Sequence, residues 1–306
     1  MPRVSVIIPA YNAGDRVCEA IESAAAQTYS DFEIIVVDDG STDDTERKVK
    51  RFGGRVRYLR QENQGVSAAR NFGIRASGGE YVAFLDADDL WNRDKLERQV
   101  PALESDARVG LVCSDWTLEV KGTVIPSVLS TRPAVRSGYL FREVVRNAFV
   151  LTSTVIVRRR YLEDVGGFDE RFPTAEDQDL WLRISYRHLV AFVPIALTTK
   201  RQQDNGLSSD PRAASVYQIK LLEKALASLP DLSRRNRQLL QSVLSRNYLD
   251  LGYDDFSRMA LRQARGSLVS SLTNDWTRVR SLVYLVATYL PVSMVNTIRS
   301  VKRSFA

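Results

Sequence analysis

Short apolar segments alternate with helical patterns over the first 90 residues, and this alternation constrains the fold more than any other feature. The apolar segments are Val4–Pro9, Phe32–Val37, Val56–Arg60 and Tyr81–Leu85, and helical spacing follows the first three at 14–27, 41–51 and 65–76. Continuous apolar runs of this length are typical of strands buried on both faces. The sequence therefore predicts an α/β fold, with a mostly parallel, Rossmann-like sheet that carries helices on both faces.

The pattern changes character near residue 208. Before this point it predicts a strand over Val109–Ser114, a helix over Ser137–Ala148 and a strand over Thr152–Val157. Beyond Ser208–Pro211 only helical patterns follow, over 213–228, 233–251 and 255–268. We expect a sheet domain over residues 1–208 and a helical C-terminal extension over 209–306.

Polar residues follow three of the predicted strands. They are Tyr11-Asn12, Asp38-Asp39 and Asp86-Ala87-Asp88-Asp89. Ligands of such sheets bind outside the carboxyl ends of the strands, so we expect these residues to share one crevice. Three carboxylates within four positions repel one another unless they share a cation. The sequence favours a nucleotide–metal site, although a solvated acidic turn is the alternative for the Asp-x-Asp alone. No Gly-x-Gly-x-x-Gly follows the first strand, which argues against a dinucleotide site.

Ser41 or Thr42 is expected to cap the second helix, with acids in its first turns. The two cysteines, Cys18 and Cys113, make no disulfide framework and favour buried free thiols in a reducing compartment. The first residues lack the pattern of a signal peptide, so we expect a cytoplasmic protein.

The formal net charge of +6 is concentrated at the C-terminal end. Residues 262–306 hold seven basic side chains and one acidic side chain, Asp275, so the remaining residues are neutral overall. The charge therefore gives no support to a nucleic-acid-binding core, and no nucleic-acid partner is expected.

The segment Ser281–Ile298 has no charged residue and is flanked by arginines. Apolar residues recur there as one helical stripe at Val283, Ala287, Leu290, Met294, Ile298, Val301 and Phe305, and Pro291 is expected to kink the helix. The segment is marginal for spanning a bilayer. A basic amphipathic helix at the inner face of an anionic membrane fits better, and packing on the protein's own core is the alternative.

Four segments together resemble the inverting family 2 glycosyltransferases with the GT-A fold, of the bacterial, nucleotide-sugar-dependent type. They are Val4–Asn12, Val37–Asp43, Gly65–Gly73 and Gly79–Asp89, within a match over residues 3–115. A weaker block spans Gly166–Glu170 and Glu176–Trp181. The resemblance implies a donor half over about 1–115 and an acceptor half over about 116–208. It also implies transfer of a hexose-like sugar from a nucleotide diphosphate, most commonly UDP, to a hydroxyl of a glycan or lipid-linked acceptor in cell-surface polysaccharide synthesis.

The resemblance also implies roles for individual residues. Those expected to bind the nucleotide-sugar are Pro9, Tyr11, Asn12, Asp38, Asp39, Arg70, Asp86 and Ala87. The ring of Tyr11 would lie against the base, and Asp38 or Asp39 would accept from a base N–H. Alternatives are a core aromatic for Tyr11 and an ordinary exposed helix residue for Arg70.

A divalent cation, Mn²⁺ or Mg²⁺, is the expected partner of the diphosphate. Asp88 is its expected ligand. Asp86 is expected to contact the ribose or the metal's water shell, and Asp89 is the alternative for the same role. Many family members place a histidine after the last strand, whereas this chain has Gln203, a neutral and weaker ligand.

Inversion requires a base that accepts the proton of the attacking hydroxyl. The resemblance assigns that role to Asp177, with Glu176 or Asp179 as substitutes. Because these acids begin a predicted helix, simple matching to the helix dipole is the alternative. The only histidine, His188, is expected to be structural or exposed.

The acidic motif is also typical of two other classes of protein. A phosphotransferase of the haloacid-dehalogenase type would use Asp86 as nucleophile, but its motif usually lies on the first strand and would leave Asp38 and Asp39 unexplained. A catalytically dead scaffold of the same fold is the second, and the intact set of acids argues against it.

Overall fold

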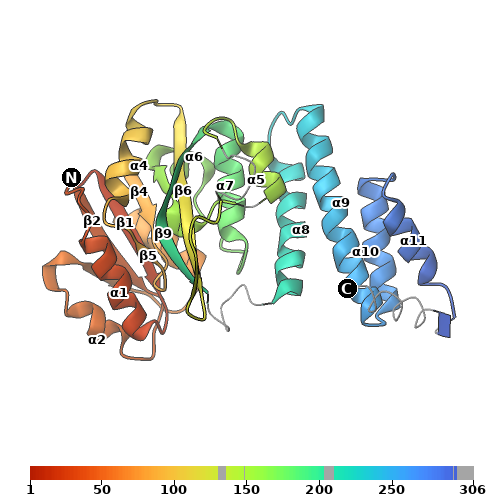
Figure 1. The fold of residues 1–306 in the computed structure, drawn as a ribbon, viewed down its shortest axis with the longest axis horizontal. Helices are drawn as coiled ribbons and strands as arrows, with labels where there is room; N and C mark the ends of the chain where they lie inside the picture. Colours follow the sequence, from red (N-terminus) through yellow and green to blue (C-terminus); the bar gives the residue numbers. More distant parts are fainter. Residues whose placement is uncertain (130–135, 148, 203–209, 292, 295–306) are drawn as a thin grey trace. The chain divides into compact units, whose positions relative to one another are not determined.

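The computed structural model describes residues 1–129, 136–147, 149–202, 210–291 and 293–294 (Figure 1). The chain divides into two compact units, residues 1–207 and 208–306. The first holds the sheet and the second is helical, and each is described by itself.

The first unit is built on a nine-stranded sheet in the order β3-β2-β1-β4-β8-β6-β9-β5, with β7 paired to β6. The strands are β1 (Val4–Ala10), β2 (Phe32–Asp38), β3 (Arg57–Arg60), β4 (Tyr81–Phe84), β5 (Leu90–Trp91), β6 (Val109–Val120), β7 (Thr123–Ile125), β8 (Ile156–Arg158) and β9 (Leu189–Gln202). Strands β1 to β4 are parallel, so β1, β2 and β4 end at one edge, which we call the carboxyl edge. Strand β8 runs antiparallel to β4 and β6, β5 runs antiparallel to β9, and β6 and β9 are parallel.

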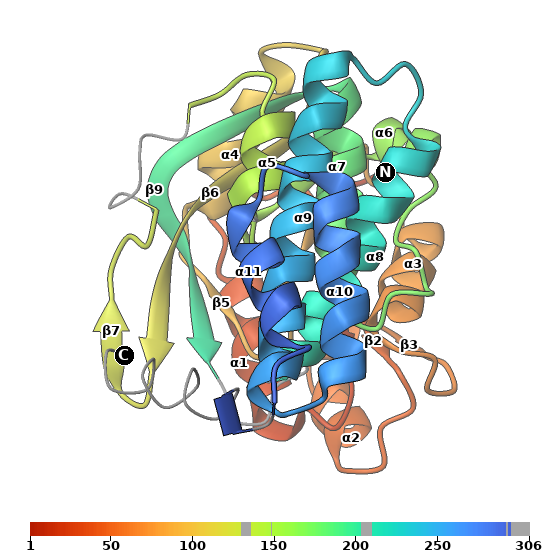
Figure 2. The same cartoon turned by 90° about the vertical axis from the view of Figure 1, so that its right-hand side faces the viewer.

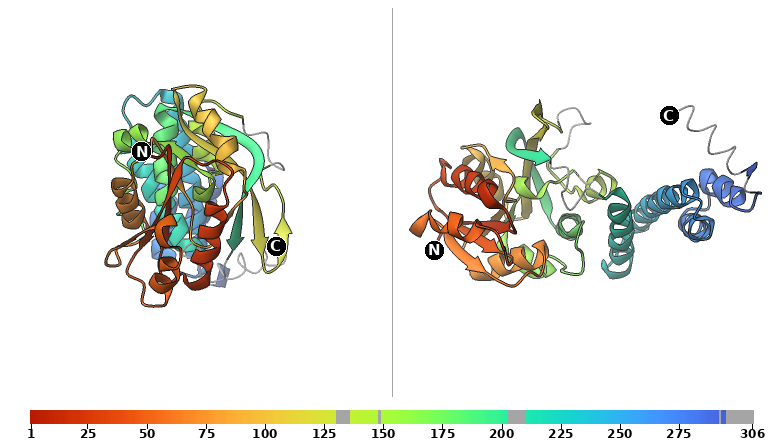
Figure 3. Two further views of the ribbon diagram at one scale, coloured as in Figure 1. Left: turned by 90° about the vertical axis from the view of Figure 1, so that its left-hand side faces the viewer. Right: turned by 90° about the horizontal axis from the view of Figure 1, so that it is seen from below.

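Helices cover both faces of this sheet, as expected (Figure 3). They are α1 (Gly14–Ala25), α2 (Thr45–Lys50), α3 (Val66–Ala76), α4 (Lys95–Glu104), α5 (Phe141–Asn147), α6 (Arg159–Val165) and α7 (Glu176–Arg187), with 3₁₀ turns η1 (Gly53–Arg55) and η2 (Thr152–Thr154). On one face, Val6 and Ile8 pack with residues of α1 and α4. On the other, Ile7 meets α3 and Phe84 meets Trp181 of α7, with ring centroids 6.0 Å apart.

Two local predictions are wrong. Ser41 and Thr42 do not cap α2, which begins at Thr45, because the hydroxyl of Ser41 accepts a hydrogen bond from the backbone N–H of Asn12 instead. The predicted strand Thr152–Val157 begins with the η2 turn, and its strand portion is Ile156–Arg158. The turn forms because the backbone N–H of Thr154 donates to Leu151 O at 2.9 Å and that of Val155 donates to Thr152 O at 3.0 Å, which closes the chain on itself.

The second unit contains α8 (Pro211–Ser228), α9 (Arg234–Ser257), α10 (Leu261–Asn274) and α11 (Val279–Ala287). The Asp210 side chain caps α8 and the Ser233 hydroxyl caps α9. Leu249, Phe256, Ala264, Leu268 and Ala287 form its core. Hydroxyls of Ser245, Ser271 and Ser281 join α9, α10 and α11 at 3.0 and 2.7 Å, which permits close helix packing.

The predicted apolar stripe of the tail is neither uniformly buried nor uniformly exposed where the structure describes it. Ala287 is buried on the core of the second unit, whereas Val283, one turn earlier on the same side of α11, is 58% exposed. Helix α11 packs on α10 through its buried face (Figure 2). The predicted stripe residues Ile298, Val301 and Phe305 lie outside the described residues. Within the described part of the chain, no helix is long and apolar enough to cross a membrane.

Candidate active site

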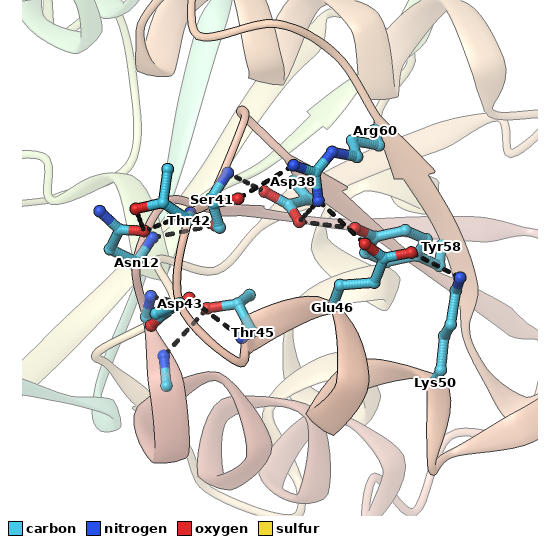
Figure 4. Close-up of polar contacts among 12 residues, drawn as sticks. Asn12, Asp38, Ser41, Thr42, Asp43, Thr45, Glu46, Lys50, Tyr58 and Arg60 are labelled. Carbon is cyan, nitrogen blue, oxygen red and sulfur yellow. Dashed lines mark hydrogen bonds and ion pairs between the residues drawn. The ribbon is translucent and has the colours of Figure 1, made fainter.

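The ends of β1 and β2 are tied together at the carboxyl edge (Figure 4). Asn12 stands in the left-handed region, with a φ of 46°. Its backbone N–H donates to Ser41 Oγ at 2.9 Å, and its side-chain Oδ1 accepts from the backbone N–H of Thr42 at 2.8 Å. The N–H of Asp39 also donates to Ala10 O at 2.8 Å. Tyr11, between these contacts, is 52% exposed, so the alternative of a core aromatic is wrong.

Asp38 is fully buried under this loop. Its carboxylate accepts from the backbone N–H of Ser41 at 2.7 Å, from the Tyr58 hydroxyl at 2.5 Å and from Arg60 Nη1 at 3.4 Å (Figure 4). Burial and this hydrogen bond raise the pKa of Tyr58. Asp38 therefore holds the loop after β2 to the neighbouring strand β3.

Asp39 supports the loop before α3. Its carboxylate accepts from Gln61 Nε2 at 2.7 Å and from the backbone N–H groups of Gln64 and Gly65 at 2.9 and 2.8 Å. A carboxylate has about four acceptor positions, which leaves room for one further donor such as a base N–H. Pro9, the remaining β1 candidate, is buried within its strand.

Arg70 connects the acids that follow β4 with the start of α7. Its side chain is 4% exposed, its Nη2 donates to Asp86 Oδ1 at 2.7 Å and its Nη1 donates to Glu176 Oε1 at 2.7 Å. The guanidinium lies 5.1 Å from the ring centre of Phe168. The alternative of an exposed helix residue is wrong. Arg70 joins two carboxylates that are 90 residues apart in the chain.

We call residues 86–89 the acid loop. Asp89 is 3% exposed and accepts from Ser153 Oγ at 2.6 Å and from the Arg201 backbone N–H at 3.2 Å. Burial, together with Asp86 and Asp88, raises the pKa of Asp89 to about 8. Arg201 Nε also donates to Asp88 O at 2.6 Å. Asp89 thus points inward as a support, whereas the Asp86 side chain is 30% exposed.

The acid loop fits a divalent cation that is shared with a ligand. Asp86 and Asp88 offer hard carboxylate oxygens, the type that Mg²⁺ and Mn²⁺ prefer, and these ions commonly take only one or two protein carboxylates and complete their shell with phosphate and water. Among the described residues there is no cluster of three or more His, Cys, Asp or Glu that could hold a metal by itself. The third predicted ligand, Gln203, lies outside them.

The predicted bases lie at the start of α7. Asp177 is partly exposed and accepts from Thr152 Oγ1 at 2.9 Å and from the Gln178 backbone N–H at 2.7 Å. Burial raises the pKa of Asp177, and Arg70 and Thr152 oppose this shift. Burial and the neighbouring Asp177 raise the pKa of Glu176 to about 7.

Asp177 stays the predicted base among these acids, because its side chain is partly exposed. Glu176 is paired with Arg70, and Asp179 is 3% exposed and paired with Arg183 at 2.6 Å. His188 is stacked on Tyr161, with ring centroids 3.6 Å apart.

Sequence reasoning missed Thr152, Ser153 and Arg201. The sequence predicts the two hydroxyl residues as part of the strand Thr152–Val157, and their contact with the acids depends on β8 running antiparallel to β4. This pairing brings the start of β8 beside the end of β4. An unusual run of three hydroxyl residues, Thr152–Thr154, was the only signal for it in the sequence.

Comparisons with known proteins show which family this chain resembles. The family model for glycosyl transferase family 2 matches residues 5–166, and that for glycosyltransferase like family 2 matches residues 129–210. An uncharacterized glycosyltransferase from Rickettsia felis is 34% identical over 227 residues, which cover 73% of this chain and 37% of the relative. WfaP of Escherichia coli, a UDP-Glc:α-D-GlcNAc-diphosphoundecaprenol β-1,3-glucosyltransferase, is 34% identical over 188 residues, which cover 60% of this chain and 70% of the relative.

Solved structures share the fold. TarS of S. aureus in complex with UDP-GlcNAc superposes with a TM-score of 0.73 at 21% identity, over 94% of this chain and 90% of that one. The mannosyltransferase PcManGT from Pyrobaculum calidifontis, in complex with GDP-Man and Mn²⁺, has a TM-score of 0.65 at 21% identity, over 98% and 83% of the two chains. The fold is therefore that of the GT-A glycosyltransferases, with a helical C-terminal region. The chain belongs to glycosyl transferase family 2.

Proposed function

We propose that this protein is an inverting glycosyltransferase that moves a hexose from a UDP-sugar to a hydroxyl of a lipid-linked or other glycan acceptor during cell-surface polysaccharide synthesis. The activity of the E. coli relative WfaP, which uses UDP-glucose and a lipid-linked acceptor, supports the substrate class. The family match does not favour the haloacid-dehalogenase alternative.

The observation that carries this proposal is the Arg70 bridge. One guanidinium holds Asp86 of the acid loop and Glu176 at the start of α7, each at 2.7 Å, so the donor acids and the helix of the base are fixed beside each other. Transfer to a hydroxyl requires this proximity, because the sugar must lie between its leaving diphosphate and the attacking oxygen.

In the proposed reaction, the acceptor oxygen attacks the anomeric carbon while its proton passes to the carboxylate of Asp177. The bond between the anomeric carbon and the diphosphate oxygen breaks, and the nucleoside diphosphate leaves with the electron pair. Attack opposite to the leaving group inverts the anomeric configuration. Glu176 positions Arg70 and is the second candidate for proton transfer.

Asp88, with Asp86 beside it, would hold the divalent cation, Mn²⁺ or Mg²⁺. When bound, the cation supplies positive charge that offsets the charge growing on the leaving diphosphate. Tyr11 would lie on the base, Asp39 would accept from a base N–H, and Asn12 and Ala87 would line the nucleotide.

A transfer assay with the full chain tests the proposal. It would contain Mn²⁺, a panel of UDP-sugars and a synthetic acceptor that carries GlcNAc on a lipid diphosphate, and NMR of the product would read the anomeric configuration. We expect inversion, and we expect Asp177→Asn to lower kcat by about 10²- to 10⁴-fold, as the loss of a general base does. Asp94→Asn, a change at an acid already paired with Arg98, is the matched control. Retention of configuration, or full activity of Asp177→Asn, would refute the mechanism.

We further propose that the second unit contacts an anionic membrane surface through α11, at the inner face of the plasma membrane. Val279, Leu282, Val283 and Val286 are 52–68% exposed and recur at helical spacing, Trp276 and Tyr289 flank them, and Arg280 is exposed beside them. Apolar and aromatic side chains next to arginine are typical of interfacial helices. Such contact would bring the enzyme to a lipid-linked acceptor.

Co-sedimentation with vesicles tests this contact. The protein should bind vesicles rich in phosphatidylglycerol more strongly than vesicles of phosphatidylcholine alone, and the double variant Leu282→Ser/Val286→Ser should lose binding at unchanged helix content. Equal binding by the wild type and this variant would exclude α11, and concentration-dependent self-association without lipid binding would assign the face to a second copy of the chain.

A further inference from the structure

The η2 turn lies between the acid loop and the predicted base, and the proposed function gives it no role. Thr152, Ser153 and Thr154 are all buried, at 2%, 0% and 0% exposure. Because β8 pairs antiparallel with β4, the turn before β8 lies where β4 ends and the acid loop begins. It is the point at which the first and second halves of the sheet meet at the carboxyl edge.

The hydroxyls of this turn reach both groups of acids. Thr152 Oγ1 donates to Asp177 Oδ2 at 2.9 Å. Ser153 Oγ donates to Asp89 Oδ2 at 2.6 Å and accepts from the backbone N–H of Asp86 at 3.1 Å. Two consecutive residues thus connect the predicted base with the acid loop.

The turn itself is held from behind by buried side chains. Two carbonyls, those of Ser153 and Thr154, accept four hydrogen bonds at 2.7–3.2 Å, from Trp91 Nε1, Thr198 Oγ1, Gln99 Nε2 and Lys95 Nζ. These donors come from β5, β9 and α4, so three elements fix one turn. Lys95 and Gln99 are both fully buried. A turn held by this many hydrogen bonds has little freedom to shift, so the acids that it contacts are held in place as well.

We propose that the Thr152–Thr154 turn is a positioning element of the transferase, in which Thr152 orients the base Asp177 and Ser153 orients the acid loop for the cation and diphosphate. The inference rests on the proposed function, because it assigns these two residues a task in the same reaction. Neither residue touches the reacting atoms, so both are positioning residues.

The Thr152 hydrogen bond has two consequences for Asp177. It fixes Oδ2, while the Gln178 N–H fixes Oδ1, and each oxygen keeps one free acceptor position for the acceptor hydroxyl. It also favours the ionised carboxylate and so opposes the rise in pKa that burial causes. The other charged groups that act on Asp177 are Arg70, Glu176 and Asp86. Loss of the Thr152 hydroxyl should therefore leave a carboxylate that is less well oriented and protonated at higher pH.

The first test asks whether Thr152 acts on the base Asp177 and not on the cation site. Thr152→Val keeps the shape and removes the donor. We expect the acidic limb of its pH–kcat profile to move up by about half a pH unit or more, with the Mn²⁺ requirement unchanged. Thr152→Ser, which restores the donor, should return the limb to its wild-type position. If Thr152→Val does not fold, Thr152→Cys, a weaker donor, should move the limb in the same direction.

The second test concerns Ser153. Ser153→Ala should need roughly tenfold more Mn²⁺ to reach half-maximal UDP binding by calorimetry, as losses of outer-shell partners do, and its acidic limb should not move. Ser185→Ala, which removes another buried hydroxyl whose partner is a backbone carbonyl of α7, is the matched control and should change neither quantity.

The outcomes distinguish this inference from the proposed function. If the wild type transfers sugar and the acidic limb of the pH–kcat profile does not move in any Thr152 variant, the role of Thr152 is overturned. If the Mn²⁺ dependence of UDP binding is unchanged in Ser153→Ala, the role of Ser153 is overturned. If the wild type transfers no sugar, the proposed function fails. The turn is then tested by the ¹³C NMR titration of the Asp177 carboxyl in metal-free protein, which should still move upward in Thr152→Val.

Discussion

Arg70 shows how a single residue joins distant parts of this chain. The Gly65–Gly73 segment that contains it could be recognised in the sequence, and so could the acids that it contacts. The pairing itself could not be predicted, because it depends on α3 and α7 approaching the same edge of the sheet. A planar guanidinium with a fork of donors suits this position, since it meets two carboxylates at once.

We predict that Arg70→Lys lowers the free energy of unfolding by about 2–4 kcal/mol and lowers kcat, because an ammonium cannot bridge both carboxylates and leaves one of them buried without a partner. Urea unfolding and the transfer assay measure the two effects. Arg75→Lys, an exposed change on the same helix, is the control and should change stability by less than about 0.5 kcal/mol. Equal stability of the two variants would contradict a structural role for the bridge.

Lys95 gives a second prediction at this scale. The residue is fully buried, and burial lowers the pKa of its ammonium to about 7. Between about pH 7 and the ordinary lysine pKa of about 10.4, Lys95 holds a proton in the unfolded chain but has lost it in the folded chain. This group therefore makes the folded state more stable as the pH rises. In Lys95→Met this contribution is absent.

The difference in unfolding free energy, wild type minus Lys95→Met, should therefore increase between pH 6.5 and 9, as read by urea unfolding at several pH values. Lys50→Met removes an exposed lysine paired with Glu46, and its difference should stay constant over the same range. A constant difference for Lys95→Met would show that Lys95 is charged in the folded protein.

At the scale of elements, the parallel half of the sheet could be predicted well from the sequence because its strands are continuous apolar runs. The second half could not, since β8 and β5 are short and their antiparallel partners lie far away in the chain. For the same reason the η2 turn was mistaken for a strand. The tail stripe failed for a different reason: α11 is apolar on two faces, and periodicity alone does not say which of them meets the core.

Helix α3 offers a test of how closely an element must approach the sheet. A Cβ at Gly73 would lie 2.6 Å from Ile7 Cγ2 and 3.2 Å from Val37 Cγ2. Gly73→Ala should therefore push α3 and Arg70 away from the edge and cost about 1–3 kcal/mol of stability. Gly54→Ala, at a site with nothing within 4 Å of the added Cβ, is the control. Thermal unfolding measures both, and a neutral Gly73→Ala would contradict the close packing.

At the scale of the whole molecule, the sequence predicted the class of fold and the edge of the sheet where the acids gather. It did so because parallel strands leave their functional residues at one edge whatever covers their faces. The relation of these acids to Asp177 needed the structure. The central claim is that Asp86 and Asp88 make a nucleotide–metal site beside a fixed base.

Calorimetric titration of the full chain with UDP, with and without Mn²⁺, tests this claim most directly. We predict that the wild type binds UDP strongly only with Mn²⁺, that Asp88→Asn loses most of this binding with its fold intact by circular dichroism, and that Asp94→Asn binds like the wild type. UDP binding that is equal in the wild type and Asp88→Asn, or that is independent of Mn²⁺, would contradict the account.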